Sequence, residues 1–397
     1  MTNYNDKYLG TDLLNKNVKI CLNCIYDSSL SGIRFNEKNI CNYCEMIENL
    51  KNQYGTGSPK GLRLLDKILD SIKKSGKNKK YDVVIGISGG TDSSYLLYWA
   101  KKNGLRPLAA HYDNTFNSHV ATQNIRKITE KLNIDLYTHV CDNKESEDIF
   151  RSFFLAGVPE IDGPTDIALA EVMFRAASKY KIKYVLEGHS FIAEGVSPLG
   201  KAYIDGKYIK TIHKKFGKIP MRTFPNMTLI KFLYWSLFKN IKKIRPYWYI
   251  NYSKEEAKKI LKEKFDWVDY GGHHLENRMT AFHHSYYTPI KFNLDQRNNT
   301  LAARVRFGSL SRNDALKEYS KPPFMEKDLK NYILKRLEID NDEFVSVFNG
   351  PKKYFYDFKT YKKTFELFKP IFYLLAKLNL VPMSFYLKYC FKLKKNI

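Results

Sequence analysis

The stretch that most restricts the fold runs from Tyr81 to Gly104 and reads YDVVIGISGGTDSSYLLYWAKKNG. Its first eight residues form an apolar run with β-branched side chains that ends at the glycine pair, which predicts a buried strand. The glycine pair is followed by an amphipathic pattern that ends at Gly104 and predicts a helix. A buried strand that turns through glycines into a helix is typical of a parallel α/β sheet.

The alternation of strands and helices continues after this unit. The segments RPLAAHYDNTF, DLYTHVC and IKYVLEGHS predict strands, and HVATQNIRKITEKLN and DIALAEVMFRAASKYK predict the helices between them. We therefore expect an α/β fold, with a parallel sheet and helices on both of its faces. Such sheets bind ligands beyond the C-terminal ends of their strands, where Asp113, Gly188 and His189 lie.

Four cysteines near the N-terminus form two CxxC pairs separated by 16 residues: Cys21, Cys24, Cys41 and Cys44. Each pair can supply half of a tetrahedral thiolate shell, so the spacing predicts a zinc ribbon with a closed, structural site. The remaining cysteines, Cys141 and Cys390, are far apart in the sequence, and the set does not resemble a secreted disulfide framework. Apolar spacing through residues 45–75 predicts a helix after the ribbon.

Beyond residue 216 the sequence shows aromatic-basic helical patterns and no further strand–helix alternation. We expect four regions: a zinc ribbon with the start of a linker helix (1–55), the α/β domain (56–215), a helical C-terminal substrate domain (216–345) and a basic aromatic tail (346–397). The N-terminus is polar and no apolar run reaches the roughly 18 residues of a spanning helix, so we expect a cytoplasmic protein.

The formal net charge of +25 is concentrated in two segments. Residues 201–245 carry twelve Lys or Arg and one acid, and residues 351–397 carry eleven Lys and two acids. This pattern favours contact with something anionic, such as a nucleotide, nucleic acid or lipid headgroups. A compositional bias toward lysine, with solvated lysine faces, explains it equally well. Segments 228–245 and 351–397 also mix aromatic and basic residues, which is compatible with peripheral docking at the inner face of a membrane.

The SGGTDSS turn has the composition of an anion-binding loop. Gly89 and Gly90 let the backbone approach an anion, and the following helix adds the positive end of its dipole. Asp92 is a candidate Mg²⁺ ligand. The hydroxyl donors of the loop are Ser88, Thr91, Ser93 and Ser94. Neither GxxxxGK[ST] nor GxGxxG is present, so the common P-loop and the dinucleotide fingerprint are excluded.

This turn resembles the PP-loop of ATP pyrophosphatases, whose pattern is SGGxDS. The resemblance implies that ATP is cut between its α and β phosphates, that the loop holds the pyrophosphate, and that AMP is transferred to an oxygen of the acceptor. It also implies that Asp113, Gly188 and His189 shape the ATP pocket together with residues 88–94.

Several downstream segments are similar to the N-acetyl sugar amidotransferase family: GPTDIALAEVMF, LEGHSFIAEGVSP, DYGGHHLENRMTAF, YYTPIKFNLDQR and GSLSRNDAL. With the zinc ribbon and the PP-loop, the similarity covers roughly residues 18–325. Ala193 departs from the family pattern, which usually has Thr before Glu-Gly. The resemblance implies that an adenylated N-acetyl group of a surface-polysaccharide precursor reacts with ammonia to give an acetamidino group. It also implies a separate glutaminase and an ammonia-channelling barrel, similar to the subunits of imidazole-glycerol-phosphate synthase.

The stretch DYGGHHLENRMTAFHHSYY, residues 269–287, holds four of the nine histidines. His273 is followed four residues later by Asn277, so the i, i+4 pair of a helical zinc site is missing, and Arg278 would repel a cation. Buried scaffold and substrate contact both remain open for this stretch. The candidate catalytic residues are Asp92, Glu276, Arg278 and Lys291. The candidate substrate-binding residues are His273, His274, Glu276, Arg278 and Arg297.

An alternative is a zinc-ribbon PP-loop enzyme that modifies tRNA by thiolation or lysidine formation, which the basic segments would suit. Thiolation usually needs a persulfide-carrying cysteine pair or a cluster held by cysteine thiolates, and only Cys141 and Cys390 remain once zinc takes four thiols. Neither of these has the flanking glycines of a glutaminase nucleophile, so ammonia would have to come from a partner.

Overall fold

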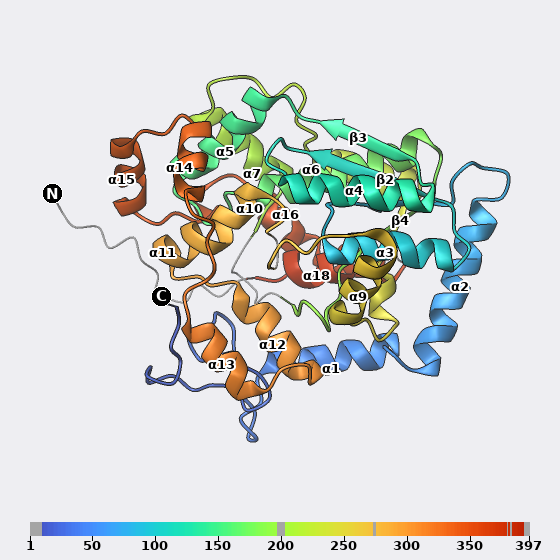
Figure 1. Cartoon of the computed structure of the whole chain (residues 1–397), viewed down its shortest axis with the longest axis horizontal. Coiled ribbons are helices and arrows are strands. Elements are labelled where there is room, and N and C mark those ends of the chain that lie inside the picture. The colour runs from blue at the N-terminus through green and yellow to red at the C-terminus, as the bar shows by residue number, and fades with distance from the viewer. Residues whose placement is uncertain (1–9, 197–202, 273–274, 379, 382, 393–397) are drawn as a thin grey trace.

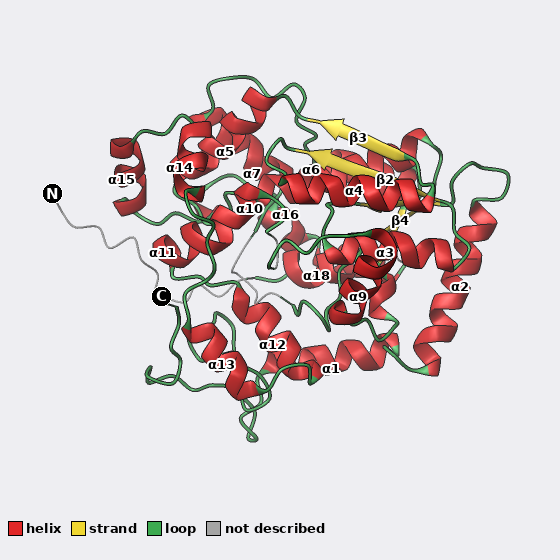
Figure 2. Ribbon diagram, viewed as in Figure 1, coloured by secondary structure: helices red, strands yellow, loops and turns green. Residues whose placement is uncertain are grey.

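The computed structural model describes residues 10–196, 203–272, 275–378, 380–381 and 383–392. Its centre is a parallel five-stranded sheet in the order β3-β2-β1-β4-β5. The strands are β1 (Val83–Gly86), β2 (Pro107–Asp113), β3 (Leu136–Val140), β4 (Tyr184–Leu186) and β5 (Lys242–Ile244). The predicted fold class is confirmed: a parallel sheet between helical layers, with a cysteine cluster before it and a mainly helical region after it (Figures 1 and 2).

Both faces of the sheet are covered by helices because alternate strand residues are apolar on both sides. Val83 and Ile85 of β1 pack into one core with α3 (Thr91–Lys102) and α4 (His119–Leu132). Val84 packs into the other core, on the opposite face of the sheet. The first core also includes α2 (Pro59–Ser75) and α9 (Lys254–Phe265), and the second includes α5 (Asn143–Ala156), α6 (Gly163–Lys179) and α7 (Gly206–Phe216). Figure 1 shows α3 and α4 in front of the sheet and α6 behind it.

One expectation about secondary structure is confirmed and another was wrong. Residues 45–75 are helical as predicted and form two helices, α1 (Asn42–Tyr54) and α2, because Gly55 adopts a left-handed conformation (φ 61°) and Pro59 begins the second helix. The region beyond residue 216 does contribute a strand, since β5 pairs in parallel with β4. Before it, α8 (Leu229–Leu233) and a π-helix (Tyr234–Phe238) end at Asn240 with φ 51°, and the chain then enters the sheet edge.

The C-terminal region is helical and packs on both earlier parts of the chain. Its helices are α10 (Arg278–Phe282), α11 (Thr288–Phe292), α12 (Arg297–Phe307), α13 (Arg312–Ser320), α14 (Leu329–Arg336), α15 (Asn341–Asn349), α16 (Lys362–Leu367), α17 (Lys369–Lys377) and α18 (Met383–Tyr389). A π-helix (His283–Tyr287) joins α10 to α11, and short 3₁₀ turns lie at Pro246–Trp248 and Phe355–Asp357. α12 and α13 share a core with the cysteine module, beside which they lie in Figure 1. Within the described segments, none of the helices is long and apolar enough to cross a membrane.

Candidate active site

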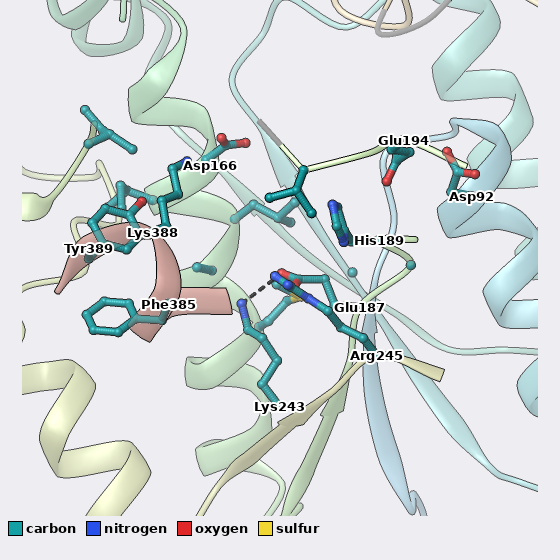
Figure 3. A pocket seen from close by; sticks show the side chains of 18 of the residues that line it. Asp92, Asp166, Glu187, His189, Glu194, Lys243, Arg245, Phe385, Lys388 and Tyr389 are labelled. Atoms are coloured by element: carbon teal, nitrogen blue, oxygen red, sulfur yellow. Dashed lines mark hydrogen bonds and ion pairs between the residues drawn. The ribbon is translucent and has the colours of Figure 1, made fainter. Parts of the chain in front are cut away.

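A cavity of about 770 Å³ opens beyond the C-terminal ends of β1 and β4. The PP-loop forms one wall, the loop after β4 forms the floor, and α6 and α18 close the far end. Figure 3 shows Asp92 and Glu194 at one end, His189 near the middle, and Lys388 and Tyr389 of α18 at the other end. Because the cavity lies where parallel sheets bind ligands, it is the candidate active site.

The PP-loop is held in shape by residues that need glycine or bury their side chains. Gly89 has φ +80°, and a Cβ there would lie 2.3 Å from the carbonyl oxygen of Ala121. Trp267 donates from Nε1 to the carbonyl of Gly89 at 3.0 Å, which fixes the turn from the outside. Thr91 and Ser94 are fully buried. The remaining predicted loop residues line the cavity: Ser88, Gly90, Asp92 and Ser93.

Asp92 begins a charged cluster that local sequence did not reveal. Its Oδ2 accepts from Lys254 Nζ at 2.7 Å, and its Oδ1 accepts from the Tyr252 hydroxyl. Burial alone would lower the pKa of Lys254, but the carboxylates of Asp92 and Glu194 hold that pKa above its usual value. Lys254 therefore supplies at the loop the cation that the common P-loop carries in its own motif.

The same contacts bear on the predicted Mg²⁺ role of Asp92. Both carboxylate oxygens already accept hydrogen bonds, and one of those donors is a lysine cation. In this arrangement one oxygen of Asp92 is paired with the Lys254 ammonium, whose charge opposes a second cation there, so the donor set around Asp92 does not favour Mg²⁺. Within the described residues, Cys21, Cys24, Cys41 and Cys44 are the only group of three or more potential metal ligands within reach of one ion.

The loop after β4 carries a second charged cluster. Glu187 pairs with Lys243 at 2.8 Å and with Arg245 at 2.6 Å, as the dashed line to Lys243 in Figure 3 marks for the first pair. Burial disfavours its charge, yet the two cations hold the pKa of Glu187 well below its usual value. Burial and the nearby Arg245 lower the pKa of His189 to about 3, and its Nδ1 accepts from Trp248 Nε1 at 3.3 Å. His189 is therefore a neutral imidazole at physiological pH.

Glu276 lines the cavity directly beside the PP-loop. Its carbonyl accepts from the Ser118 amide at 2.8 Å, and the Arg278 amide donates to the carbonyl of Phe116 at 2.9 Å, so this short segment is tied to the loop after β2. A Cβ built on Gly90 would lie 3.2 Å from Glu276 Oε1 and 3.1 Å from the Tyr270 hydroxyl. Part of the stretch 269–287 is thus an active-site wall.

Other residues predicted from this region lie elsewhere. Arg278 pairs with Glu326 at 3.1 Å, and its guanidinium lies over the Tyr332 ring. Lys291 is 4% exposed and donates to the carbonyls of Val347, Phe348 and Gly350 at 2.7–3.1 Å, where it caps the C-terminal end of α15. Neither side chain lines the cavity.

Arg297 and Asp113 are also held in structural contacts. Arg297 pairs with Asp295 at 2.6 Å and donates to the carbonyl of Lys321, so it joins α12 to the end of α13. Asp113 accepts from the Thr115 amide at 2.7 Å and shapes the turn after β2. Neither side chain lines the cavity, so the structure does not place either one where it was expected to contact substrate or ATP.

The histidines of residues 269–287 divide into three cases. His273 and His274 lie outside the described residues. His283 is buried and its Nε2 lies 2.7 Å from the carbonyl of Pro159. His284 lines the cavity.

The cysteine cluster has the geometry of a metal site. The sulfurs of Cys21 and Cys44 and of Cys24 and Cys41 are 3.8 Å apart, and those of Cys41 and Cys44 are 3.6 Å apart. Thiolates bound to zinc at about 2.3 Å in a tetrahedron lie about 3.8 Å from one another. Arg306 of α12 donates to Cys44 Sγ at 3.2 Å, as expected where thiolate charge must be balanced. The cluster fits zinc and offers no open position for a substrate.

The cysteine module also supports the cavity wall. The Tyr26 hydroxyl donates to Asn299 Oδ1 at 2.9 Å and to the carbonyl of Val196 at 3.3 Å. Asn299, Val196 and Met46 of α1 line the cavity. Tyr26 therefore links the ribbon to the cavity wall.

Sequence reasoning missed several cavity residues: Glu187, Glu194, Lys243, Arg245, Lys254, Tyr270 and Lys388. Glu194 lies within FIAEG, a segment already noted for its family pattern, so a signal for it was present. Lys254 sits in SKEEAKK, which reads as an ordinary capped helix start, and nothing local distinguishes it from a surface lysine.

Comparison with known proteins bears on the C-terminal region first. Residues 276–371 match the family model described as "LPS biosynthesis protein WbpG-like, C-terminal domain". The predicted relationship to proteins of surface-polysaccharide synthesis is thereby confirmed. The tRNA-specific 2-thiouridylase MnmA 2 of Fusobacterium nucleatum is 30% identical over 118 residues, which is 27% of this chain and 33% of that relative. The chain thus spans about a third of the length of this curated relative.

Two solved structures resemble this chain at low similarity. The NMN synthetase from Francisella tularensis has 16% identity and a TM-score of 0.30, over 70% of this chain and 94% of that chain. The NH3-dependent NAD synthetase from Campylobacter jejuni has 12% identity and a TM-score of 0.30, over 74% and 98%. At these scores neither likeness bears on what the cavity binds.

Proposed function

From the premise that the chain carries the C-terminal domain of WbpG-like LPS biosynthesis proteins, we propose that it is an ATP-dependent amidotransferase acting on a sugar N-acetyl group. The observation that carries this proposal is the single cavity in which the PP-loop, Lys254 and Glu276 meet. It brings an anion-binding loop and a carboxylate together in one cavity, where an acceptor would lie. ATP and an N-acetylated sugar of a surface-polysaccharide precursor are the proposed substrates.

The reaction proceeds in two balanced steps. The acetamide oxygen attacks the α phosphorus of ATP, an O–P bond forms, and the α–β bridging bond breaks with its electron pair leaving on pyrophosphate. Ammonia then attacks the activated carbon, loses one proton, and expels AMP with the C–O electron pair. The product is a protonated acetamidino group. Adenylation is needed because an unactivated amide is a poor electrophile with no adequate leaving group.

The chain's own residues fit these steps. The backbone amides and hydroxyls of Ser88, Gly90 and Ser93 can bind the pyrophosphate, with the dipole of α3 behind them. Lys254 can neutralise charge on the leaving group, and Asp92 positions it through the 2.7 Å ion pair. Glu276, beside Gly90 in the cavity lining, can accept the proton that ammonia loses. His189 contributes as a neutral hydrogen-bonding group.

Two parts of the proposal concern groups beyond the chain. Zinc at the four cysteines would stabilise the ribbon and, through Tyr26, the cavity wall. The ammonia source is proposed to be a separate glutaminase with a channelling barrel, because the two remaining cysteines are buried and neither lines the cavity.

The test is an assay of the purified chain with ATP, an ammonium salt and a panel of N-acetylated nucleotide sugars. We expect pyrophosphate and AMP to appear only with the correct sugar, together with a product about 1 Da lighter, since NH replaces O in the adenylated acyl group. Lys254→Gln should reduce turnover about 100- to 1000-fold, and Lys258→Gln, on the same helix and paired with Asp269, is the matched control. Pyrophosphate release that requires tRNA and no sugar would overturn the proposal.

Thiolation of tRNA is the second candidate, favoured by the partial likeness to a 2-thiouridylase. Its chemistry needs a reactive thiol near the ATP site. Cys141 and Cys390 are each 1% exposed, and burial raises the pKa of both thiols, that of Cys390 to about 11. The amidotransferase assignment needs no thiol, so the cavity supports it better.

A further inference from the structure

Two helical stretches in the C-terminal half carry apolar side chains on both of their faces. In α8 and its π-helical continuation, Phe232 and Trp235 pack inward, and in α17 Phe372 and Ala376 do the same. The outward positions are also apolar. They are Ile230, Tyr234, Leu237 and Phe238 in the first stretch, and Leu367 at the end of α16, Ile371 and Leu374 of α17 and Leu378 directly after it in the second. A helix that is apolar on all sides is normally buried, so these outer faces lack the polar surface that solvent contact favours.

The outward residues are well exposed, and those of the second stretch continue from the end of α16 along α17. Leu367, Ile371, Leu374 and Leu378 recur at intervals of four, three and four residues, and each is at least 53% exposed. Ile230 and Phe238 are 79% and 81% exposed. Together with Phe368 and Tyr373, these two stretches hold ten of the 22 exposed large apolar side chains found in the described residues. We name the eight residues of the previous paragraph the outer stripes.

The two outer stripes border the same helix. The Phe385 ring of α18 lies 5.6 Å from that of Phe232 and 5.4 Å from that of Phe372, measured between centroids. Phe385 also lines the active-site cavity, beside Lys388 and Tyr389 (Figure 3). The outer stripes and the far end of the cavity therefore share α18 as a common wall.

The charge around the outer stripes is positive. Residues 228–245 contain no acidic residue, and residues 359–378 contain only Glu366, which pairs with Lys362 at 3.3 Å. Lys239, Lys363 and Lys377 are exposed beside the stripes. Lysine is depleted in protein–protein interfaces, whereas lysines beside an exposed apolar helix face are typical of binding to anionic lipid.

We propose that the outer stripes dock the protein onto an anionic lipid bilayer, with α8, its π-helical continuation and α16–α17 lying in the headgroup region. The apolar side chains would enter the acyl boundary and the lysines would contact phosphate groups. Docking in this way places the α18 end of the cavity next to the membrane surface. This inference concerns a surface outside the ATP half of the site, and it stands independently of the proposed reaction.

Co-sedimentation of the full chain with vesicles tests the proposal. Phosphatidylglycerol-containing vesicles should bind the protein, pure phosphatidylcholine vesicles should bind it at least about tenfold more weakly, and added salt should weaken binding. Phe238→Glu combined with Leu374→Glu should lower binding to the anionic vesicles at least about tenfold. The matched control combines Phe324→Glu with Leu62→Glu, which are 71% and 50% exposed at other sites, and should leave binding unchanged.

Two outcomes would overturn the inference. One is no binding to phosphatidylglycerol vesicles, or equal binding by both double variants. The other is concentration-dependent self-association that Phe238→Glu with Leu374→Glu abolishes while vesicle binding is absent, which would assign the surface to a second copy of the chain. Circular dichroism of each variant distinguishes lost docking from lost folding. Because ATP-dependent pyrophosphate release is measured separately, failure of docking leaves the proposed reaction open, and the reverse also holds.

Discussion

The two walls of the cavity are built in different ways. The PP-loop wall comes from one continuous stretch, residues 86–94, whose shape follows from its glycines and from the helix it begins. The second wall is assembled from separate segments that contribute Lys254, Tyr270, Glu276 and Lys388. The first wall depends on local backbone geometry, and the second depends on how distant elements pack. Substitutions of single side chains should therefore distinguish catalytic residues from structural residues mainly on the second wall.

The largest effect is expected at Lys254, where the two walls meet. Lys254→Gln removes the cation that faces Asp92 and should reduce ATP-dependent pyrophosphate release about 100- to 1000-fold, the usual result of losing one preorganised electrostatic group. Pre-steady-state and steady-state pyrophosphate assays measure it. Lys258→Gln on the same helix should stay within about twofold of the unchanged enzyme. If Lys254→Gln lowers pyrophosphate release only slightly, Lys254 does not stabilise the leaving group.

Lys291 contrasts with Lys254. The sequence suggested a catalytic role for Lys291, but in the structure it is a buried residue that stabilises the fold. Lys291→Met should lower the free energy of unfolding by about 3 kcal/mol, because carbonyls at the end of α15 lose their donor. Urea denaturation measures the loss. The turnover number per folded molecule should remain close to that of the unchanged enzyme, and a selective fall in that number would restore Lys291 to the active site.

The pH dependence of stability tests the environment of His189. Its folded-state pKa of about 3 lies below the ordinary value, so the unfolded chain binds a proton that the folded chain does not as pH falls. The stabilising contribution is complete above about pH 6.5 and should decline by about 2–3 kcal/mol between pH 6.5 and pH 4. Denaturation at several pH values should show this decline, and His189→Asn should flatten it. A rate profile with a limb near pH 6.5 that disappears in the variant would identify His189 as a base instead.

Glu276 and Arg278 are two residues apart, yet only Glu276 lines the cavity. Glu276→Gln should lower turnover with added ammonia about 10- to 30-fold, through loss of the proton acceptor. Its effect should shrink at high pH, where solvent base replaces the carboxylate. Arg278→Gln should change turnover by less than about twofold, because its partner Glu326 lies outside the cavity. The reverse ranking would show that the sugar approaches from the Arg278 side.

The smallest effect is expected where the cysteine module touches the cavity. Tyr26→Phe removes the hydrogen bond to Asn299. The free energy of substrate binding should become less favourable by about 1 kcal/mol, the usual worth of one such bond. This is measured as a several-fold rise in KM, and the zinc content should not change. Metal analysis of the variant provides the control. An unchanged KM would show that the ribbon stabilises the fold without influencing the site.

Local sequence was sufficient for the parts of this molecule that are determined by neighbouring residues. The CxxC pairs predicted the four-sulfur cluster, and SGGTDSS after an apolar run predicted the strand, the turn and the helix around Gly89. The alternating pattern predicted the parallel sheet. These features follow from backbone conformation and short-range spacing, which the sequence displays directly.

Only the tertiary structure decided which charged residues share the cavity. Glu276, Arg278, Lys291 and Arg297 look alike as candidates in the sequence, but Glu276 alone reaches the cavity because residues 276–278 pair with the loop after β2. Lys254 reaches Asp92 from 162 residues away, and α18 closes the far end from the tail that sequence reasoning left unassigned. The physical reason is that a charge is placed by the packing of the element that carries it, and that packing depends on contacts between residues far apart in the chain.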